Sequence, residues 1–177
     1  MSRAALFVIT GLLWAVHSLV VLADGASRDR PPPGDWSRVL LFSAAIASFA
    51  LAIRAFARMV GGRVATRIAY AVTAGALLAS VANVFEDGFG VDAAFWPFVV
   101  GTVVIVPGLA LLTALVAFRG PSRVLAIVPG ACLLDILLLH PVGGGVLTLL
   151  AWLVAAAESI RRTRSIVTVQ PSGLDPR

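Results

Sequence analysis

The chain contains a run of 20 residues, 4–23, without a single charged side chain, and several more runs of similar length follow it. A helix of that length measures about 30 Å, the thickness of the hydrocarbon core of a bilayer. The mean hydropathy is +0.97, with 59% hydrophobic and only 13% charged residues. This leaves too little polar surface for a water-soluble domain. The sequence therefore predicts a multi-pass integral membrane protein.

The apolar runs predict an all-α integral membrane protein in which a six-helix transmembrane bundle occupies one domain, residues 1–164. The last two spans are short and only His140 and Pro141 separate them, so we expect them to form a tight helical hairpin. Residues 165–177 are predicted to be a disordered cytoplasmic tail. A signal peptide in the first run is an alternative, which would leave five helices. The predicted spans are 4–23, 39–60, 68–85, 93–118, 124–139 and 142–157.

Arginine is distributed unequally between the two sides of this predicted bundle. All 14 basic residues are arginine, and alternate connections carry most of them. Short basic loops stay in the cytoplasm, so both termini are predicted to be cytoplasmic. The arginine usage, with abundant Ala, Gly and Val, suggests a bacterial protein and hence the bacterial plasma (inner) membrane. The predicted cytoplasmic anchors are Arg54, Arg58, Arg63, Arg67, Arg119, Arg123, Arg161, Arg162 and Arg164.

These arginines also indicate the partners of the chain. They flank apolar segments in short groups, and no aromatic residues interleave with them to stack bases, which argues against nucleic acid. We expect them to face anionic headgroups of the lipid bilayer on the cytoplasmic side. Other membrane proteins, or further copies of the chain in a homo-oligomer, are the remaining candidate partners.

A few polar side chains lie inside the predicted spans, where each is costly unless it is paired or hydrated. Asp135 lies about 11 residues into the fifth span and is too short to reach the headgroups. The other polar groups fall on the same side of the membrane midplane. We predict an outward-opening polar pocket lined by His17, Asn83, Asp135 and His140, with Glu86 and Asp87 at its mouth. The alternative is that Asp135 makes one structural hydrogen bond, for example to His17.

Three classes of function remain open. The sequence favours a structural, assembly or regulatory membrane subunit. The alternative is a protein that binds or transports a small molecule, an ion or protons through Asp135 and His17. The third is a haem- or metal-dependent membrane enzyme, with His17 and His140 as axial ligands. The sequence has no paired-histidine, Cys-x-x-Cys, Walker or dinucleotide motif, so we predict no catalytic residues, no metal site and no cofactor.

Overall fold

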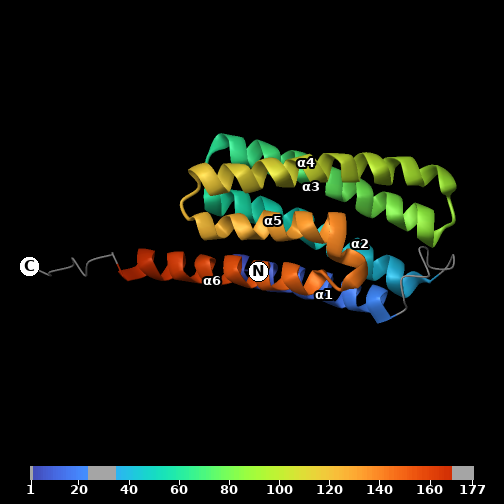
Figure 1. The fold of residues 1–177 in the computed structure, drawn as a ribbon, viewed down its shortest axis with the longest axis horizontal. Coiled ribbons are helices and arrows are strands. Elements are labelled where there is room, and N and C mark those ends of the chain that lie inside the picture. Colours follow the sequence, from blue (N-terminus) through green and yellow to red (C-terminus); the bar gives the residue numbers. More distant parts are fainter. Residues whose placement is uncertain (1, 24–34, 169–177) are drawn as a thin grey trace, which may run out of the picture.

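The computed structural model describes residues 2–23 and 35–168, and this part of the chain consists of helices joined by short turns, with no strand. Short π-helical turns at Val84–Gly88 and Asp135–Leu139 and 3₁₀ turns at Asp92–Ala94, Arg123–Ala126 and His140–Val142 adjoin the main helices. The α-helices, labelled in Figure 1, are α1 (Arg3–Ala23), α2 (Trp36–Val60), α3 (Arg63–Asn83), α4 (Phe95–Arg119), α5 (Ile127–Leu134) and α6 (Gly145–Thr168).

Four helical segments are long and apolar enough to cross a membrane. They correspond to the first four predicted spans, and each extends the predicted bounds by one to five residues at one or both ends. The third and fourth include the adjoining π and 3₁₀ turns. The chain is thus an all-helical protein of the membrane-embedded class. These four segments are Arg3–Ala23, Trp36–Val60, Arg63–Gly88 and Asp92–Arg119.

The hairpin after α4 differs in detail from the predicted spans. Only eight residues of α5 are α-helical, but the flanking 3₁₀ and π turns make 123–142 continuously helical. Gly143 then adopts a left-handed conformation, with φ of 87°, which glycine accommodates without steric cost. The turn delays the start of the next helix to Gly145, three residues after the predicted start of the sixth span.

The end of α6 also lies beyond its predicted position. The helix continues to Thr168, past the predicted end of the span at 157 and into the first residues of the predicted tail. Glu158 bonds to Arg161 and Arg162, three and four residues further on, and such pairs stabilise an exposed helix. Residues 169–177, the rest of the predicted tail, lie outside the described residues.

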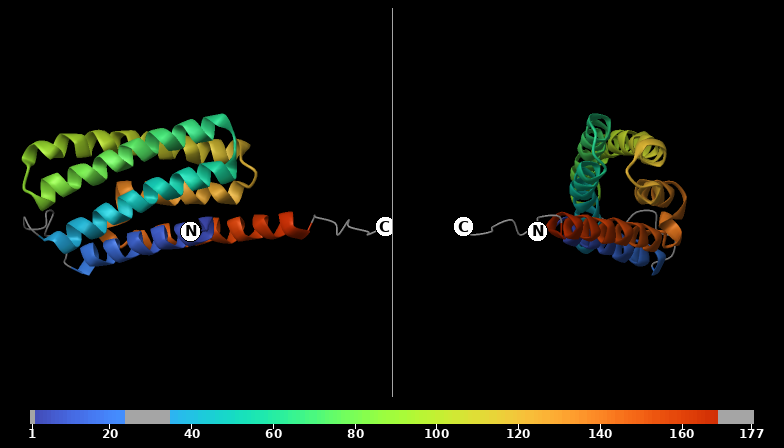
Figure 2. Two further views of the ribbon diagram at one scale, coloured as in Figure 1. Left: turned by 180° about the vertical axis from the view of Figure 1, so that it is seen from behind. Right: turned by 90° about the vertical axis from the view of Figure 1, so that its left-hand side faces the viewer.

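The helices form a closed ring. Each packs against the next along the chain, and α6 returns to lie beside α1 (Figure 1). The end-on view in Figure 2 shows α2 and α3 on one side, α4 and α5 on the other, and α1 with α6 closing the third. Residues far apart in sequence, at the end of α1 and around the α5–α6 turn, are therefore neighbours.

Small residues allow the tightest of these helix contacts. A Cβ atom added to Gly75 of α3 would lie 2.7 Å from the carbonyl oxygen of Gly101 in α4, so no side chain fits there. Close approach of backbones at small residues is a common way for helices to associate in lipid. Between α1 and α6, a Cβ atom on Gly11 would lie 2.8 Å from the Leu149 side chain. Glycines thus set the spacing at two sides of the ring.

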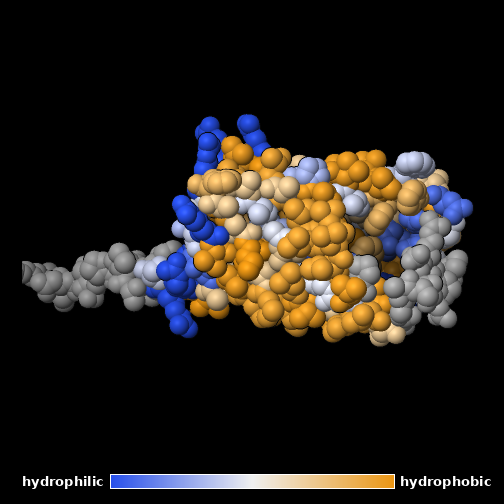
Figure 3. Space-filling view, in the orientation of Figure 1, coloured by the Kyte–Doolittle hydropathy of each residue, from blue (hydrophilic) through white to orange (hydrophobic). Residues whose placement is uncertain are grey.

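The outer surface separates apolar and charged residues. The flank of the bundle is largely hydrophobic, and the most strongly hydrophilic side chains gather at one end, where the α2–α3 and α4–α5 turns and the end of α6 lie, with a smaller hydrophilic area at the other end (Figure 3). The predicted arginine anchors belong to these segments. Large apolar side chains such as Leu51, Leu111 and Leu137 are more than half exposed on the flank. A surface of this kind suits contact with lipid. We call the hydrophilic end the arginine-rich end.

Candidate binding site

Asp135 is the most deeply buried ionisable carboxylate in the described chain, with 1% of its surface exposed. It is the first residue of the π-helical turn Asp135–Leu139, and π turns frequently occur at functional sites. Its Oδ2 atom accepts a hydrogen bond of 3.2 Å from the hydroxyl of Thr148 in α6. Its Oδ1 atom lies 3.7 Å from Nδ1 of His140, beyond hydrogen-bond distance.

Two histidines lie together beside this carboxylate. The rings of His17 and His140 are stacked, with centroids 5.0 Å apart and planes inclined by 21°. His17 also stacks on Phe42 at 4.6 Å, and the indole of Trp14 meets His140 edge to face at 5.7 Å. The structure thus brings His17, Asp135 and His140 into one cluster, which we call the His–Asp cluster.

The stacked rings do not fit the haem hypothesis. Axial ligands direct a nitrogen lone pair, which lies in the ring plane, at the same iron from opposite sides. Here the ring faces, not the ring edges, oppose one another, so the nitrogens of His17 and His140 do not converge on a point between them. Within residues 2–23 and 35–168, no group of three His, Cys, Asp or Glu side chains could hold a metal ion.

The turn between α5 and α6 is held in place by α1. The Ser18 hydroxyl donates to the carbonyl oxygen of His140 at 3.2 Å and accepts the backbone N–H of Gly145 at 3.1 Å. It therefore satisfies one of the free N–H groups at the start of α6. Gly144 packs directly against the Asp135 carboxylate, where a Cβ atom would collide with Oδ1. The position of His140 thus depends on one hydroxyl and a run of glycines.

A cavity of about 210 Å³ adjoins the His–Asp cluster in the interior of the ring. Its wall is mainly apolar, and the polar side chains that line it are those of His140 and Thr102. The Thr102 hydroxyl is already bonded to the Phe98 carbonyl of its own helix, at 3.1 Å. Figure 3 shows the surface hollowed toward the end of the bundle that lies away from the arginine-rich end. The aromatic residues that line the cavity are Trp14, Phe42, Phe49 and Phe98.

Several buried polar atoms of this region have no hydrogen-bond partner within the described residues. They are Nδ1 of His17, Oδ1 of Asp135, both ring nitrogens of His140 and Nε1 of Trp14. Buried polar groups in proteins are nearly always paired, because an unpaired one costs about 1–3 kcal/mol. Such a concentration beside a cavity is typical of a site that receives a polar group from a bound molecule.

The other residues of the predicted pocket belong to α3 and to the π-helical turn that follows it. Asn83 is buried between α3 and α2, where its amide donates to the Ser43 hydroxyl at 3.1 Å. It therefore takes part in helix packing and is not bonded to the His–Asp cluster. Glu86 and Asp87 are partly exposed in the π-helical turn Val84–Gly88. Their role at the mouth of a pocket stays a prediction.

Sequence reasoning missed Thr148, Ser18 and the aromatic wall of the cavity. A single threonine or serine in an apolar helix resembles a small packing residue, so its spacing carries no signal. A signal did exist for two of the aromatic residues: Phe42 and Phe49 are seven positions apart and so share one face of α2. Comparison with known protein families, curated proteins and solved structures finds no match for this chain.

Proposed function

We propose that this membrane protein binds one small, mainly apolar molecule in the cavity beside the His–Asp cluster. The observation that carries the proposal is an aromatic-lined cavity of about 210 Å³ whose wall includes His140, and neither ring nitrogen of His140 has a hydrogen-bond partner within residues 2–23 and 35–168. Nδ1 of His140 lies 3.7 Å from Oδ1 of Asp135, so we assign Nε2, the other ring nitrogen, to contact with a bound molecule. The presence of this cavity supports a ligand-binding function rather than the role of a structural, assembly or regulatory subunit.

The size and chemistry of the cavity define the ligand class. An engineered apolar cavity of about 150 Å³ in another protein binds benzene, so a molecule with one or two rings fits a cavity of this volume. Aromatic walls favour a ring that can stack or meet them edge to face. A single hydroxyl or carbonyl group on the ligand would bond to Nε2 of His140. The Asp135 carboxylate, 3.7 Å from the other ring nitrogen, adds a negative charge beside that imidazole.

Matched pairs of probes test the proposal. Toluene with phenol, and 1-methylnaphthalene with 1-naphthol, have nearly equal sizes but differ in one hydroxyl group. We expect the hydroxylated probe of each pair to bind about fivefold more tightly to the purified protein, the effect of one hydrogen bond worth about 1 kcal/mol. His140→Phe should remove this preference and still bind the apolar probes. The measurement is fluorescence or calorimetric titration in detergent.

A variant that fills the cavity provides the control. Thr102→Phe adds a ring to the wall, whereas Thr102→Val keeps the volume and removes only a hydroxyl that is bonded within its own helix. We expect Thr102→Phe to abolish binding of all four probes and Thr102→Val to leave it intact. Equal binding by wild type and Thr102→Phe would rule out this cavity as the site.

We also propose the topology: six spans, formed by the four long segments, the 123–142 segment and the part of α6 that precedes Glu158, with both termini in the cytoplasm of a bacterial cell. The concentration of arginines at one end supports this orientation. Cys132 is 3% exposed and gives little background for labelling with a membrane-impermeant maleimide. Asp92→Cys, at the opposite end, should be labelled from outside intact cells, and Arg123→Cys only after lysis. The reverse pattern would invert the proposed orientation.

A further inference from the structure

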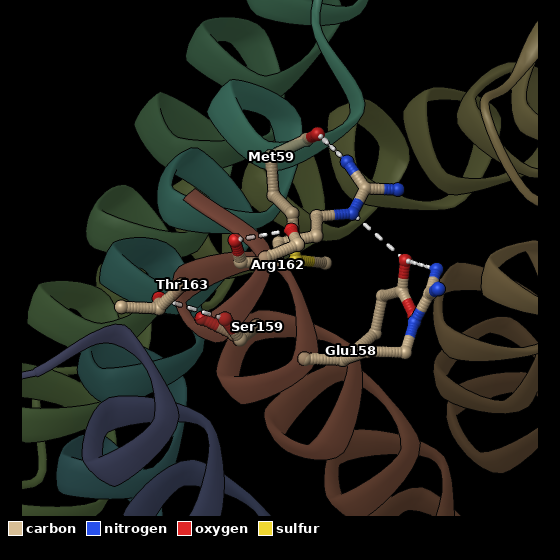
Figure 4. Close-up of polar contacts among 7 residues, drawn as sticks. Met59, Glu158, Ser159, Arg162 and Thr163 are labelled. Atoms are coloured by element: carbon tan, nitrogen blue, oxygen red, sulfur yellow. Dashed lines mark hydrogen bonds and ion pairs between the residues drawn. The ribbon is translucent and has the colours of Figure 1, made fainter. Parts of the chain in front are cut away.

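Two pairs of arginines at the arginine-rich end have different surroundings. In the first, Nε of Arg161 and Nε of Arg162 bond to the carboxylate of Glu158 at 2.7 and 2.8 Å. Arg162 also donates from Nη1 to the carbonyl oxygen of Met59, at 2.7 Å, and so ties α6 to the end of α2 (Figure 4). This pair has a counter-ion and a packing role.

The second pair is Arg54 and Arg58 in α2. Within the described residues, no carboxylate lies within ion-pair distance of either guanidinium. Instead, Cζ of Arg54 lies 4.8 Å from the ring centroid of Tyr70 in α3, and Nη2 of Arg54 is 3.4 Å from the Tyr70 hydroxyl. Arg58 lies beside the same hydroxyl. Two positive charges that no carboxylate of the described residues compensates therefore converge on one phenol.

These side chains border a shallow crevice between α2 and α3. Arg54 and Arg58 form one side, Thr66 and Tyr70 form the other, and the small residues Ala57 and Ala69 also line it. Its volume is about 10 Å³, close to the space that one water molecule needs. The crevice therefore has room for one oxygen atom of a bound anion, and the guanidinium groups at its edge can reach the others.

An apolar surface continues from the crevice toward the middle of the bilayer. Leu51 lies three residues before Arg54 on the same face of α2, and Leu77 lies seven residues after Tyr70 on the same face of α3. The two helices run in opposite directions, so both leucines are displaced away from the arginine-rich end. They are 53% and 46% exposed. A molecule bound at the crevice would thus extend over hydrocarbon-compatible surface.

We propose that the Arg54–Arg58–Tyr70 crevice binds the phosphate group of one anionic phospholipid, whose acyl chain lies along Leu51 and Leu77. Guanidinium groups bind phosphate through paired hydrogen bonds, and uncompensated basic residues at the bilayer surface attract anionic lipids. Inorganic phosphate presents the same oxygens to the crevice but has no chain to cover the leucines. The apolar surface favours the lipid as the natural occupant.

Native mass spectrometry of the full chain tests this site. The protein is released from mixed micelles that contain equal amounts of phosphatidylglycerol and phosphatidylcholine of the same acyl composition. We expect wild type to retain one phosphatidylglycerol in at least fivefold preference to phosphatidylcholine. The Arg54→Gln, Arg58→Gln variant should lose this preference. Arg63→Gln, Arg67→Gln removes the same charge from the same end but leaves the crevice intact, and should retain it.

The two double variants distinguish a specific lipid site from general charge attraction. Equal loss of the lipid in both would show charge attraction alone and overturn the proposal, as would equal retention of both lipids by wild type. Displacement of phosphatidylglycerol by 10 mM inorganic phosphate would show that the acyl chain and the apolar surface do not contribute to binding. This result would also overturn the proposal. If the Arg54, Arg58 variant fails to fold, three other results decide whether the crevice binds the lipid. They are the lipid preference of the wild type, the response of the bound lipid to phosphate, and the loss of the preference in Tyr70→Phe.

Discussion

The imidazole rings of His17 and His140 are stacked at 5.0 Å although one comes from α1 and the other from the turn before α6. This contact, with the ring of Phe42 beside it, is the structural centre of the candidate site. We expect His17→Phe to keep the stack and to change the free energy of unfolding by less than about 1.5 kcal/mol. His17→Ala removes the ring and should cost about 3 kcal/mol. Unfolding by SDS titration measures both, and equal costs would argue against stacking as the main role of His17.

The bond between Thr148 and Asp135 should contribute more than an ordinary hydroxyl bond, because its acceptor is a buried carboxylate. We expect Thr148→Val to cost about 1.5–3 kcal/mol. Thr102→Val is the control, since that hydroxyl bonds within its own helix, and it should cost less than about 0.5 kcal/mol. In a double-mutant cycle, Asp135→Val with Thr148→Val should cost less than the sum of the two single changes. Strict additivity would mean that the two groups do not interact.

The contact between Gly75 and Gly101 leads to a packing prediction. A side chain on Gly75 would meet the backbone carbonyl of Gly101, which cannot move without separating α3 from α4. We expect Gly75→Val to lower the free energy of unfolding by about 2 kcal/mol or more. Ala74→Val changes the exposed neighbour on the same helix and should have an effect within about 0.5 kcal/mol. Thermal unfolding in detergent compares the two, and similar losses would contradict the close approach.

Glu158 leads to a prediction on pH dependence. It lies just beyond the predicted end of the last span, and hydrogen bonds from Arg161 and Arg162 lower its pKa from 4.5 to about 2. A lowered pKa stabilises the fold above the unfolded value of 4.5, and this contribution disappears as the pH falls toward 2. We expect Glu158→Gln to be less stable than wild type at pH 7 by up to about 1 kcal/mol. The difference should stay constant down to about pH 4.5 and shrink below it; a constant difference at pH 3 would contradict the ion pair.

The helical, membrane-embedded class of this chain was predictable from hydropathy alone. An uncharged run of about 20 residues has few structural options in lipid, because every backbone polar group must be paired within the helix. The first four spans were placed within a few residues for this reason. The hairpin from α5 to α6 was harder to predict, because Gly143 and the π-helical turn that starts at Asp135 alter the helix bounds through local geometry that hydropathy does not report.

Depth along the spans gave a partial guide to the candidate site. It placed His17, Asp135 and His140 in the same half of the membrane, and the structure shows these three together. It placed Asn83 there too, but depth does not specify the direction in which a side chain points around its helix. The Asn83 amide faces Ser43 of α2. The cavity itself arises from the shapes of residues on several helices, and no single stretch of sequence contains that information.

The closing of the ring by α1 and α6 has a consequence for biosynthesis. His17 enters the membrane with the first helix, whereas Thr148, the hydroxyl partner of Asp135, belongs to the last. Helices are inserted in the order of synthesis. The Asp135 carboxylate therefore lies in the bilayer without the Thr148 hydroxyl until α6 has been synthesised. A ribosome-stalled chain that lacks α6 would expose Asp135 and the open side of α1 to lipid.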